Sequence, residues 1–212
     1  MNDPAWNHWY HVMGNTYGTW LAGDARGWRE RDHRKHVEGD YKSPPPREFS
    51  EGIHRRSKLL MNRDAIRLES RLRWIALVAI VGSLRKDNVD LLVASLDDHH
   101  LHLLGRFPND DPRRILGWAK LEATRAVKSY LKAHGAAVGL VAQLRKGEGI
   151  WAKRSKAEPV RDRAHQINVC KYAANHGKRG AAVFIHPSVE RALIRTNKIK
   201  PPIRAPRQRR GL

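Results

Sequence analysis

Two apolar segments separated by only three residues constrain the fold of this chain more than any other feature. Residues 89–96 read VDLLVASL and residues 100–107 read HLHLLGRF, with Asp97, Asp98 and His99 between them. Apolar runs of this length, partly β-branched, predict strands, and so short a connection joins strands that run antiparallel. The sequence therefore predicts a β-hairpin over residues 89–107.

Helical and extended patterns surround this hairpin and predict an α+β fold. In chain order, the other predicted elements are a strand at 9–16, a helix from its N-cap Asn62 to about 86–88, helices at 113–134 and 162–176, and a strand at 181–185. The last of these helices begins at Asp162, a good N-cap, and is expected to end at Gly177.

Each predicted helix has an apolar line that is expected to face the core. These lines are Leu68, Leu72, Ile75, Ala79 and Gly82; then Leu116, Ala119, Ala123, Val127 and Tyr130; then Ile167, Cys170 and Ala174.

Two segments do not follow this pattern. Residues 25–58 are polar and are interrupted by Pro44, Pro45 and Pro46, which predicts a surface insert without a helix across the prolines. Residues 191–212 form a basic tail with three prolines, which predicts disorder. We therefore expect one domain over residues 1–190, followed by this tail.

The net charge of +20 points to a polyanionic partner. Such an excess of Lys and Arg attracts nucleic acid, so DNA or RNA is the expected ligand. The longest apolar run, residues 74–82, is far shorter than the roughly 20 residues that cross a bilayer, so no membrane partner is expected. Cys170 is the single cysteine, which excludes an intrachain disulfide and suggests a cytoplasmic protein.

His100 and His102 are the first candidates for chemistry. Residues two apart on a strand project from the same face, so both imidazoles can reach one divalent cation. A His-apolar-His triplet is also common without a metal. The histidines in the first quarter of the chain, including His11, are expected at the surface.

Basic side chains are the candidates for contact with phosphate. The predicted helix 113–134 carries Arg114, Arg125, Lys128 and Lys132 opposite its apolar line, which is also the usual pattern of a solvated face. The further candidates are Lys153, Arg154, Arg207, Arg209 and Arg210. Trp20, Trp28 and Trp151 could stack on unpaired bases, although most of the seven tryptophans are expected in the core.

Several of these segments together resemble the single-tyrosine HUH transposases, in their branch associated with REP elements and insertion sequences. The segments that carry the resemblance are WYHV at 9–12, TYGTWLAGDARGW at 16–28, HLH at 100–102, WAKRSKAEPVRD at 151–162, and residues 177–184 after a helix with Tyr172. They cover most of residues 9–186, and the histidine triplet after a hairpin turn is the most specific of them.

The resemblance implies a fold, a cofactor and a reaction. It implies a ferredoxin-like antiparallel sheet with packed helices, and a magnesium or manganese ion held by His100 and His102. It also implies cleavage of single-stranded DNA beside hairpins, through a 5′-phosphotyrosine intermediate that permits strand transfer. Members of the family are monomers or homodimers, so either state is expected.

The sequence departs from this pattern at the expected nucleophile. Ser155 occupies the position where the resemblance leads us to expect tyrosine, and Tyr172 is the candidate substitute. Glu158 is the nearest carboxylate for a third metal ligand. Three hypotheses follow: a metal-dependent transposase or endonuclease, a DNA-binding descendant that does not cleave, and an RNA-binding basic protein.

Overall fold

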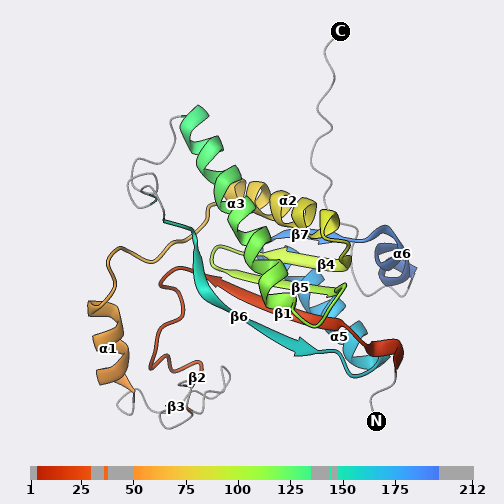
Figure 1. Cartoon of the computed structure of the whole chain (residues 1–212), viewed down its shortest axis with the longest axis horizontal. Coiled ribbons are helices and arrows are strands. Elements are labelled where there is room, and N and C mark those ends of the chain that lie inside the picture. Colours follow the sequence, from red (N-terminus) through yellow and green to blue (C-terminus); the bar gives the residue numbers. More distant parts are fainter. Residues whose placement is uncertain (1–3, 30–35, 38–49, 135–143, 145–147, 196–212) are drawn as a thin grey trace.

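The computed structural model describes residues 4–29, 36–37, 50–134, 144 and 148–195. In these residues, five strands form an antiparallel sheet in the order β6-β1-β5-β4-β7 (Figure 1). The strands are β1 (Trp9–Thr16), β4 (Asp90–Leu96), β5 (His100–Arg106), β6 (Trp151–Pro159) and β7 (Ala182–Ile185). Helices pack on both faces of the sheet, which confirms the α+β class.

The predicted hairpin is confirmed, and its second strand lies in the middle of the sheet. β4 and β5 pair with Leu96 opposite Leu101. The Asp97 carboxylate closes the turn, because its Oδ1 accepts the backbone N–H groups of His99 at 2.9 Å and His100 at 2.5 Å. On its other side, β5 pairs with β1, with His102 opposite Met13. Both neighbours of the histidine strand are therefore strands.

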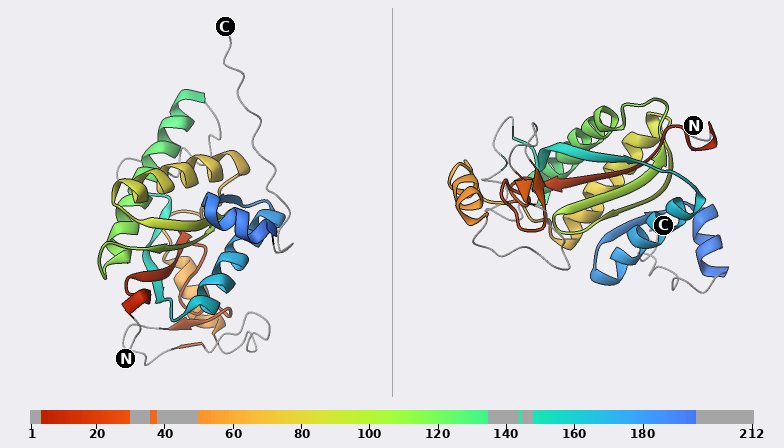
Figure 2. Two further views of the ribbon diagram at one scale, coloured as in Figure 1. Left: turned by 90° about the vertical axis from the view of Figure 1, so that its right-hand side faces the viewer. Right: turned by 90° about the horizontal axis from the view of Figure 1, so that it is seen from below.

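Helices α2 (Ser70–Lys86) and α3 (Pro112–His134) cover one face of the sheet (Figure 2). Leu101 and Leu103 of β5 are fully buried in the core beneath them. Burial of each such side chain contributes roughly 1.5–3 kcal/mol. The alternation along β5 therefore directs its leucines towards this helical layer and leaves its histidines for the opposite face.

The predicted start of α2 at Asn62 is wrong, whereas its end at Lys86 agrees with the prediction. Tertiary hydrogen bonds hold the preceding residues in a non-helical path: Tyr17 Oη donates to Asn62 Oδ1 at 2.7 Å, and the Leu68 N–H donates to the Asp98 carbonyl at 2.6 Å. The buried line also differs from the predicted one. It consists of Leu72, Ala76, Leu77, Ile80, Val81 and Leu84, while Gly82 is exposed.

Helix α3 agrees with its prediction to within one residue. Leu116, Ala119, Ala123 and Val127 are fully buried, as its apolar line predicts, and Tyr130 is half-buried at the end of the line.

Helix α5 (Arg163–Asn175) packs on the opposite face of the sheet. Asp162 caps it as predicted, since its carboxylate accepts the His165 N–H at 2.7 Å. The predicted apolar line was wrong in part: Ile167 is exposed and Ala174 half-buried. The side chains packed against Val93 and Leu104 of the sheet are Val169, Cys170 and Ala173.

The α-helix ends at Asn175 with His176 as its C-cap, as predicted, although the chain continues in a helical path. A 3-10 helix, η3 (His176–Arg179), follows α5 directly and ends at Gly180, whose φ of +83° is left-handed. His176 therefore remains on a helical path after α5.

The remaining described elements lie around this core. They are η1 (Pro4–Trp6), β2 (Trp28–Arg29), β3 (His36–Val37), α1 (Glu51–Leu59) and α6 (Pro187–Arg195). The insert thus contains a helix after its prolines, and the helix α6 extends into the predicted tail as far as Arg195. Residues 196–212 lie outside the described residues. None of the helices in the described ranges is both long and apolar enough to cross a membrane.

Candidate functional site

The strand β5 presents His100 and His102 to the face of the sheet that α5 covers. Their ring centroids lie 4.2 Å apart, and the rings are tilted by 54°. His102 is almost completely buried, with 2% of its surface exposed. The two-residue spacing and the alternation of the strand account for this shared direction.

Strand β1 adds a third imidazole, His11, and its predicted surface position is wrong because it lies on the sheet face that α5 covers. His11 is buried, and its Nε2 lies 3.1 Å from His102 Nδ1, so one of these nitrogens donates a hydrogen bond to the other. His11 Nδ1 lies 4.0 Å from the carboxylate of Glu158 on β6. Glu158 also forms an ion pair with Lys156 at 2.5 Å. His11 therefore lies between Glu158 and His102.

Tyr172 and His176 approach the same histidine from the helical layer. They are four residues apart, hence about one helical turn, and both rings lie against the ring of His102. The centroid distances to His102 are 5.0 Å for Tyr172 and 4.9 Å for His176. Tyr172 is 48% exposed, so its phenol is accessible from solvent. The packing of α5 on the sheet thus places Tyr172 beside the histidine pair.

Burial keeps these imidazoles neutral. Desolvation lowers the pKa of His102 to about 2 and those of His11 and His100 to about 4. Desolvation also lowers the pKa of His176. Neutral imidazoles each retain one nitrogen lone pair, which is the form that binds metal ions.

The imidazole cluster (His11, His100, His102 and His176) has the donor chemistry of a cation site. Nε2 of His102 and Nε2 of His176 are buried and have no hydrogen-bond partner among the described residues. A buried polar nitrogen without a protein partner is costly, and either a water molecule or an ion can satisfy it. The two nitrogens belong to adjacent rings, and His100 lies beside them. These residues therefore have the donor chemistry for a divalent cation. Among the described residues, however, no three of their nitrogens lie as close together as the ligand atoms of Asp97, Asp98 and His99 do.

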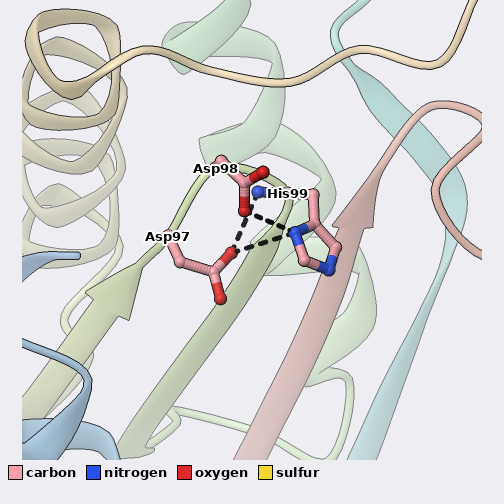
Figure 3. Close-up of side chains that lie close together, drawn as sticks. All are labelled: Asp97, Asp98 and His99. Carbon is pink, nitrogen blue, oxygen red and sulfur yellow. Dashed lines mark hydrogen bonds and ion pairs between the residues drawn. The ribbon is translucent and has the colours of Figure 1, made fainter. Parts of the chain in front are cut away.

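A second group of possible ligands lies in the turn between β4 and β5 (Figure 3). Asp97, Asp98 and His99 each offer one ligand atom, and these atoms lie within 4.8 Å of one another. Their atoms already have partners, since His99 Nδ1 lies 2.6 Å from Asp98 Oδ1 and Asp98 also pairs with Arg67. Asp97 Oδ2 lies 3.9 Å from His176 Nδ1, so this turn adjoins the imidazole cluster.

Ser155 lies on the other face of the sheet from the imidazole cluster. Its hydroxyl accepts a hydrogen bond of 2.7 Å from Nζ of Lys120, a buried residue of α3. Gly14 lies opposite Ser155 on β1, and a Cβ there would come within 3.0 Å of the Lys120 side chain. The structure therefore does not bring Ser155 together with His100 and His102. The sheet separates them.

Most of the described basic candidates also lie away from the imidazole cluster. Arg114, Arg125 and Lys132 are exposed on α3, Lys128 is half-buried there, and Lys153 and Arg154 are exposed on β6. Arg114 and Arg125 form ion pairs with Asp111 and Glu122. Since α3 covers the face opposite α5, its basic side does not line the cluster. Arg207, Arg209 and Arg210 lie outside the described residues.

The expected burial of most tryptophans is wrong. All seven lie in the described residues, and Trp151 alone of them is buried. Trp118 and Trp74 are 61% and 46% exposed on the outer helical layer. Trp20 is 36% exposed, and its ring centroid lies 6.4 Å from that of His100. Trp20 is therefore the aromatic candidate that adjoins the histidine pair.

The sequence contains weak signals for His11 and His176, the two members of the imidazole cluster that were not predicted. His11 alternates with buried Val12 on a predicted strand, which places it on the face opposite the apolar core. His176 lies four residues after Tyr172, which places both on one side of a helical path. Neither signal says which face of the sheet the helix covers.

Comparisons with known proteins found no match: no family model, no curated protein and no solved structure matches this chain.

Proposed function

We propose that this protein is a metal-dependent endonuclease and strand transferase for single-stranded or hairpin DNA, with Tyr172 as its nucleophile. The observation that carries the proposal is the edge-on contact of Tyr172 with His102, at a centroid distance of 5.0 Å and an interplanar angle of 89°. A partly exposed phenol beside a set of neutral imidazoles combines a nucleophile with ligands for a cation.

The topology supports the same proposal. Apart from β2, β3 and α1, which lie between β1 and α2, the elements follow in the order β1-α2-β4-β5-α3-β6. The four strands of this series lie in the sheet in the order β6-β1-β5-β4. This order is compatible with the split arrangement of a ferredoxin-like fold, with β7 as an additional edge strand beside β4. The resemblance to the single-tyrosine HUH transposases implies such a fold.

We assign the cation to His100, His102 and His176, whose nitrogens would have to move closer together to share it. Nε2 of His102 and Nε2 of His176 lack other described partners, and Asp97 faces the other ring nitrogen of His176. When bound, a divalent cation offsets the negative charge that grows on the phosphoryl oxygens during cleavage. Imidazole suits zinc, copper, iron and nickel, whereas magnesium and manganese both prefer oxygen ligands, so the histidines alone do not choose between the two expected ions.

Tyr172 performs the covalent step. Its Oη forms a bond to phosphorus while the bond from phosphorus to the 3′ oxygen breaks. The phenol loses its proton, the departing 3′ oxygen gains one, and the 5′ phosphate stays on Tyr172. A phenolate is also a tolerable leaving group, so attack by a 3′ hydroxyl of another strand reverses the step and completes strand transfer.

The chain's charge supplies the affinity for the substrate. A net charge of +20 attracts the phosphate backbone whatever its sequence, and this attraction weakens steeply with salt. The imidazole cluster, neutral because of its burial, adds nothing to this attraction. Binding therefore rests on lysines and arginines outside the cluster.

The test is the formation of a covalent protein–DNA adduct. Wild-type protein is incubated with Mn²⁺ or Mg²⁺ and a fluorescent hairpin oligonucleotide whose single-stranded flanks are randomised. An adduct that survives denaturing electrophoresis is expected, and mass spectrometry should place the nucleotide on Tyr172. Tyr172→Phe should abolish the adduct, and Ser155→Ala, on the other face of the sheet, should retain it.

An adduct on Ser155, or one that persists in Tyr172→Phe, would overturn the assignment of Tyr172. Hairpin binding without any adduct would select the second class, a DNA-binding protein that does not cleave. A preference for unstructured RNA over both forms of DNA would favour the third class.

A further inference from the structure

Trp20 is an exposed aromatic residue beside the imidazole cluster. It lies in the loop between β1 and β2, and 36% of its surface is exposed. Its ring centroid is 6.4 Å from that of His100, with a tilt of 50°. An aromatic ring open to solvent beside a polar site offers a platform on which an unpaired base can stack.

The ring of Trp20 is held in place by the loop around it. Its Nε1 donates a hydrogen bond of 2.9 Å to the Gly27 carbonyl. The guanidinium of Arg26 lies over the indole, 4.4 Å from the ring centroid. Arg26 is itself fixed by Asp24, through contacts of 2.8 and 2.5 Å, and by a hydrogen bond of 2.7 Å to the Thr19 carbonyl. The indole is therefore preorganised before any ligand arrives.

The loop geometry depends on a close backbone approach. Gly23 has a φ of +80°, and a Cβ at this position would lie 2.6 Å from the backbone nitrogen of His54. Asp24, next in the chain, is buried. The packing of Gly23 thus anchors the carboxylate that holds Arg26 over Trp20.

A chain of ring contacts joins Trp20 to Tyr172. Successive centroids lie 6.4 Å apart from Trp20 to His100, 4.2 Å from His100 to His102, and 5.0 Å from His102 to Tyr172. A stacked strand advances about 3.4 Å per nucleotide. A base on Trp20 would therefore lie within about five nucleotides of a phosphate at Tyr172.

We propose that Trp20, backed by Arg26, is a stacking subsite for an unpaired nucleobase of the strand that Tyr172 cleaves. This inference rests on the proposed function and adds to it that the substrate has an unpaired base near the scissile phosphate. Stacking on an aromatic side chain tolerates every base, because each has a π-face. The subsite selects single-stranded over paired DNA, since a paired base cannot leave its stack without cost.

The test uses photo-crosslinking and binding with full-length protein. Hairpin oligonucleotides carry 5-iodouracil at one position at a time along the single-stranded flanks, and all binding is measured in the Tyr172→Phe background to prevent turnover. Crosslinking should peak at one or two flank positions, and mass spectrometry should locate it at Trp20. Trp20→Ala should weaken binding of the flanked hairpin about 5- to 150-fold, with a smaller loss for Trp20→Phe.

Two controls separate stacking from structural damage. Trp118→Ala removes another exposed tryptophan from the opposite helical layer and should leave binding unchanged. Affinity for a blunt duplex should be equal in Trp20→Ala and its parent, and thermal melting should show that both are folded.

The outcomes also separate this inference from the proposed function. If wild-type protein forms the adduct but Trp20→Ala binds flanked hairpins as its parent does, the stacking subsite is wrong and the cleavage proposal stands. If no adduct forms but Trp20→Ala still loses the preference for unpaired flanks, the stacking subsite is supported and the proposal of cleavage by Tyr172 is wrong. Equal loss of duplex and single-strand binding in Trp20→Ala would also overturn the subsite.

Discussion

Tyr172 of α5 lies edge-on against His102 of the central strand β5, with an angle of 89° between the planes of the two rings. The contact brings a phenol to a histidine that is almost wholly buried and to His176, one turn further along the chain. It depends on the docking of α5 through Val169, Cys170 and Ala173. The position of the candidate nucleophile is thus set by apolar packing.

Tyr172→Phe should separate chemistry from stability. The side chain is about half exposed, and the phenylalanine ring preserves its contact with His102, so we expect the free energy of unfolding to change by less than about 1 kcal/mol. Denaturant melts measure this change. A variant that fails to form the covalent adduct while melting like wild type is the expected result, and a large loss of stability would instead assign Tyr172 a structural role.

Metal binding should depend on the imidazole cluster more than on the turn between β4 and β5. His176→Gln removes a nitrogen that has no described partner, so Mn²⁺ affinity measured by calorimetry should fall by at least about 10-fold. Asp98→Asn alters the neighbouring turn, whose atoms already have partners, and should leave the affinity nearly unchanged. The reverse ranking of the two variants would place the cation at Asp97, Asp98 and His99.

Asp97→Asn should act on the metal through His176. The amide oxygen can still accept the turn's backbone N–H groups, whereas the negative charge facing His176 Nδ1 is lost. We expect Mn²⁺ affinity to fall about 10- to 100-fold with little change in melting temperature. A clearly lower melting temperature of the metal-free variant would show instead that Asp97 acts by stabilising the turn.

Lys120 should make stability depend on pH above neutrality. Burial lowers its pKa from 10.5 to about 8 in the folded protein. Between these pH values the unfolded chain holds the proton and the folded chain does not, so the free energy of unfolding rises with pH. Relative to Lys120→Met, the free energy of unfolding of wild type should rise by at most about 3 kcal/mol between pH 8 and 10.5. Below pH 8 the difference between the two proteins should not change with pH.

Urea melts of both proteins at pH 7, 8, 9 and 10 measure this difference. Exposed Lys132→Met controls for the general loss of one positive charge. A difference between wild type and Lys120→Met that stays constant over the series would show that the folded protein holds the Lys120 proton as tightly as the unfolded chain.

Asp162→Ala should loosen the helix that carries Tyr172. Its carboxylate accepts the His165 N–H at 2.7 Å, and loss of such an N-cap costs about 1 kcal/mol. We therefore expect a lower melting temperature together with weaker adduct formation. Asp162→Asn, which also caps well, should restore both, and failure of this rescue would argue against a capping role.

Local pattern determined a large part of this fold from the sequence. The spacing of residues 89–107 predicts the hairpin, the alternation along β5 puts His100 and His102 on one side, and Asp162 marks the start of α5. These features depend on periodicity and on hydrogen bonds between residues close in sequence, so they can be predicted from the chain. The helix pattern of residues 113–134 belongs with them.

The tertiary structure decided which of these residues meet. It put Ser155 across the sheet from His102, brought His11 and His176 to it, and began α2 at Ser70 because residues near Asn62 bond to Tyr17 instead. It also left Trp20 exposed beside His100. Contacts of this kind depend on strand register and on which sheet face each helix covers, and both follow from the packing of the whole chain rather than from any local segment.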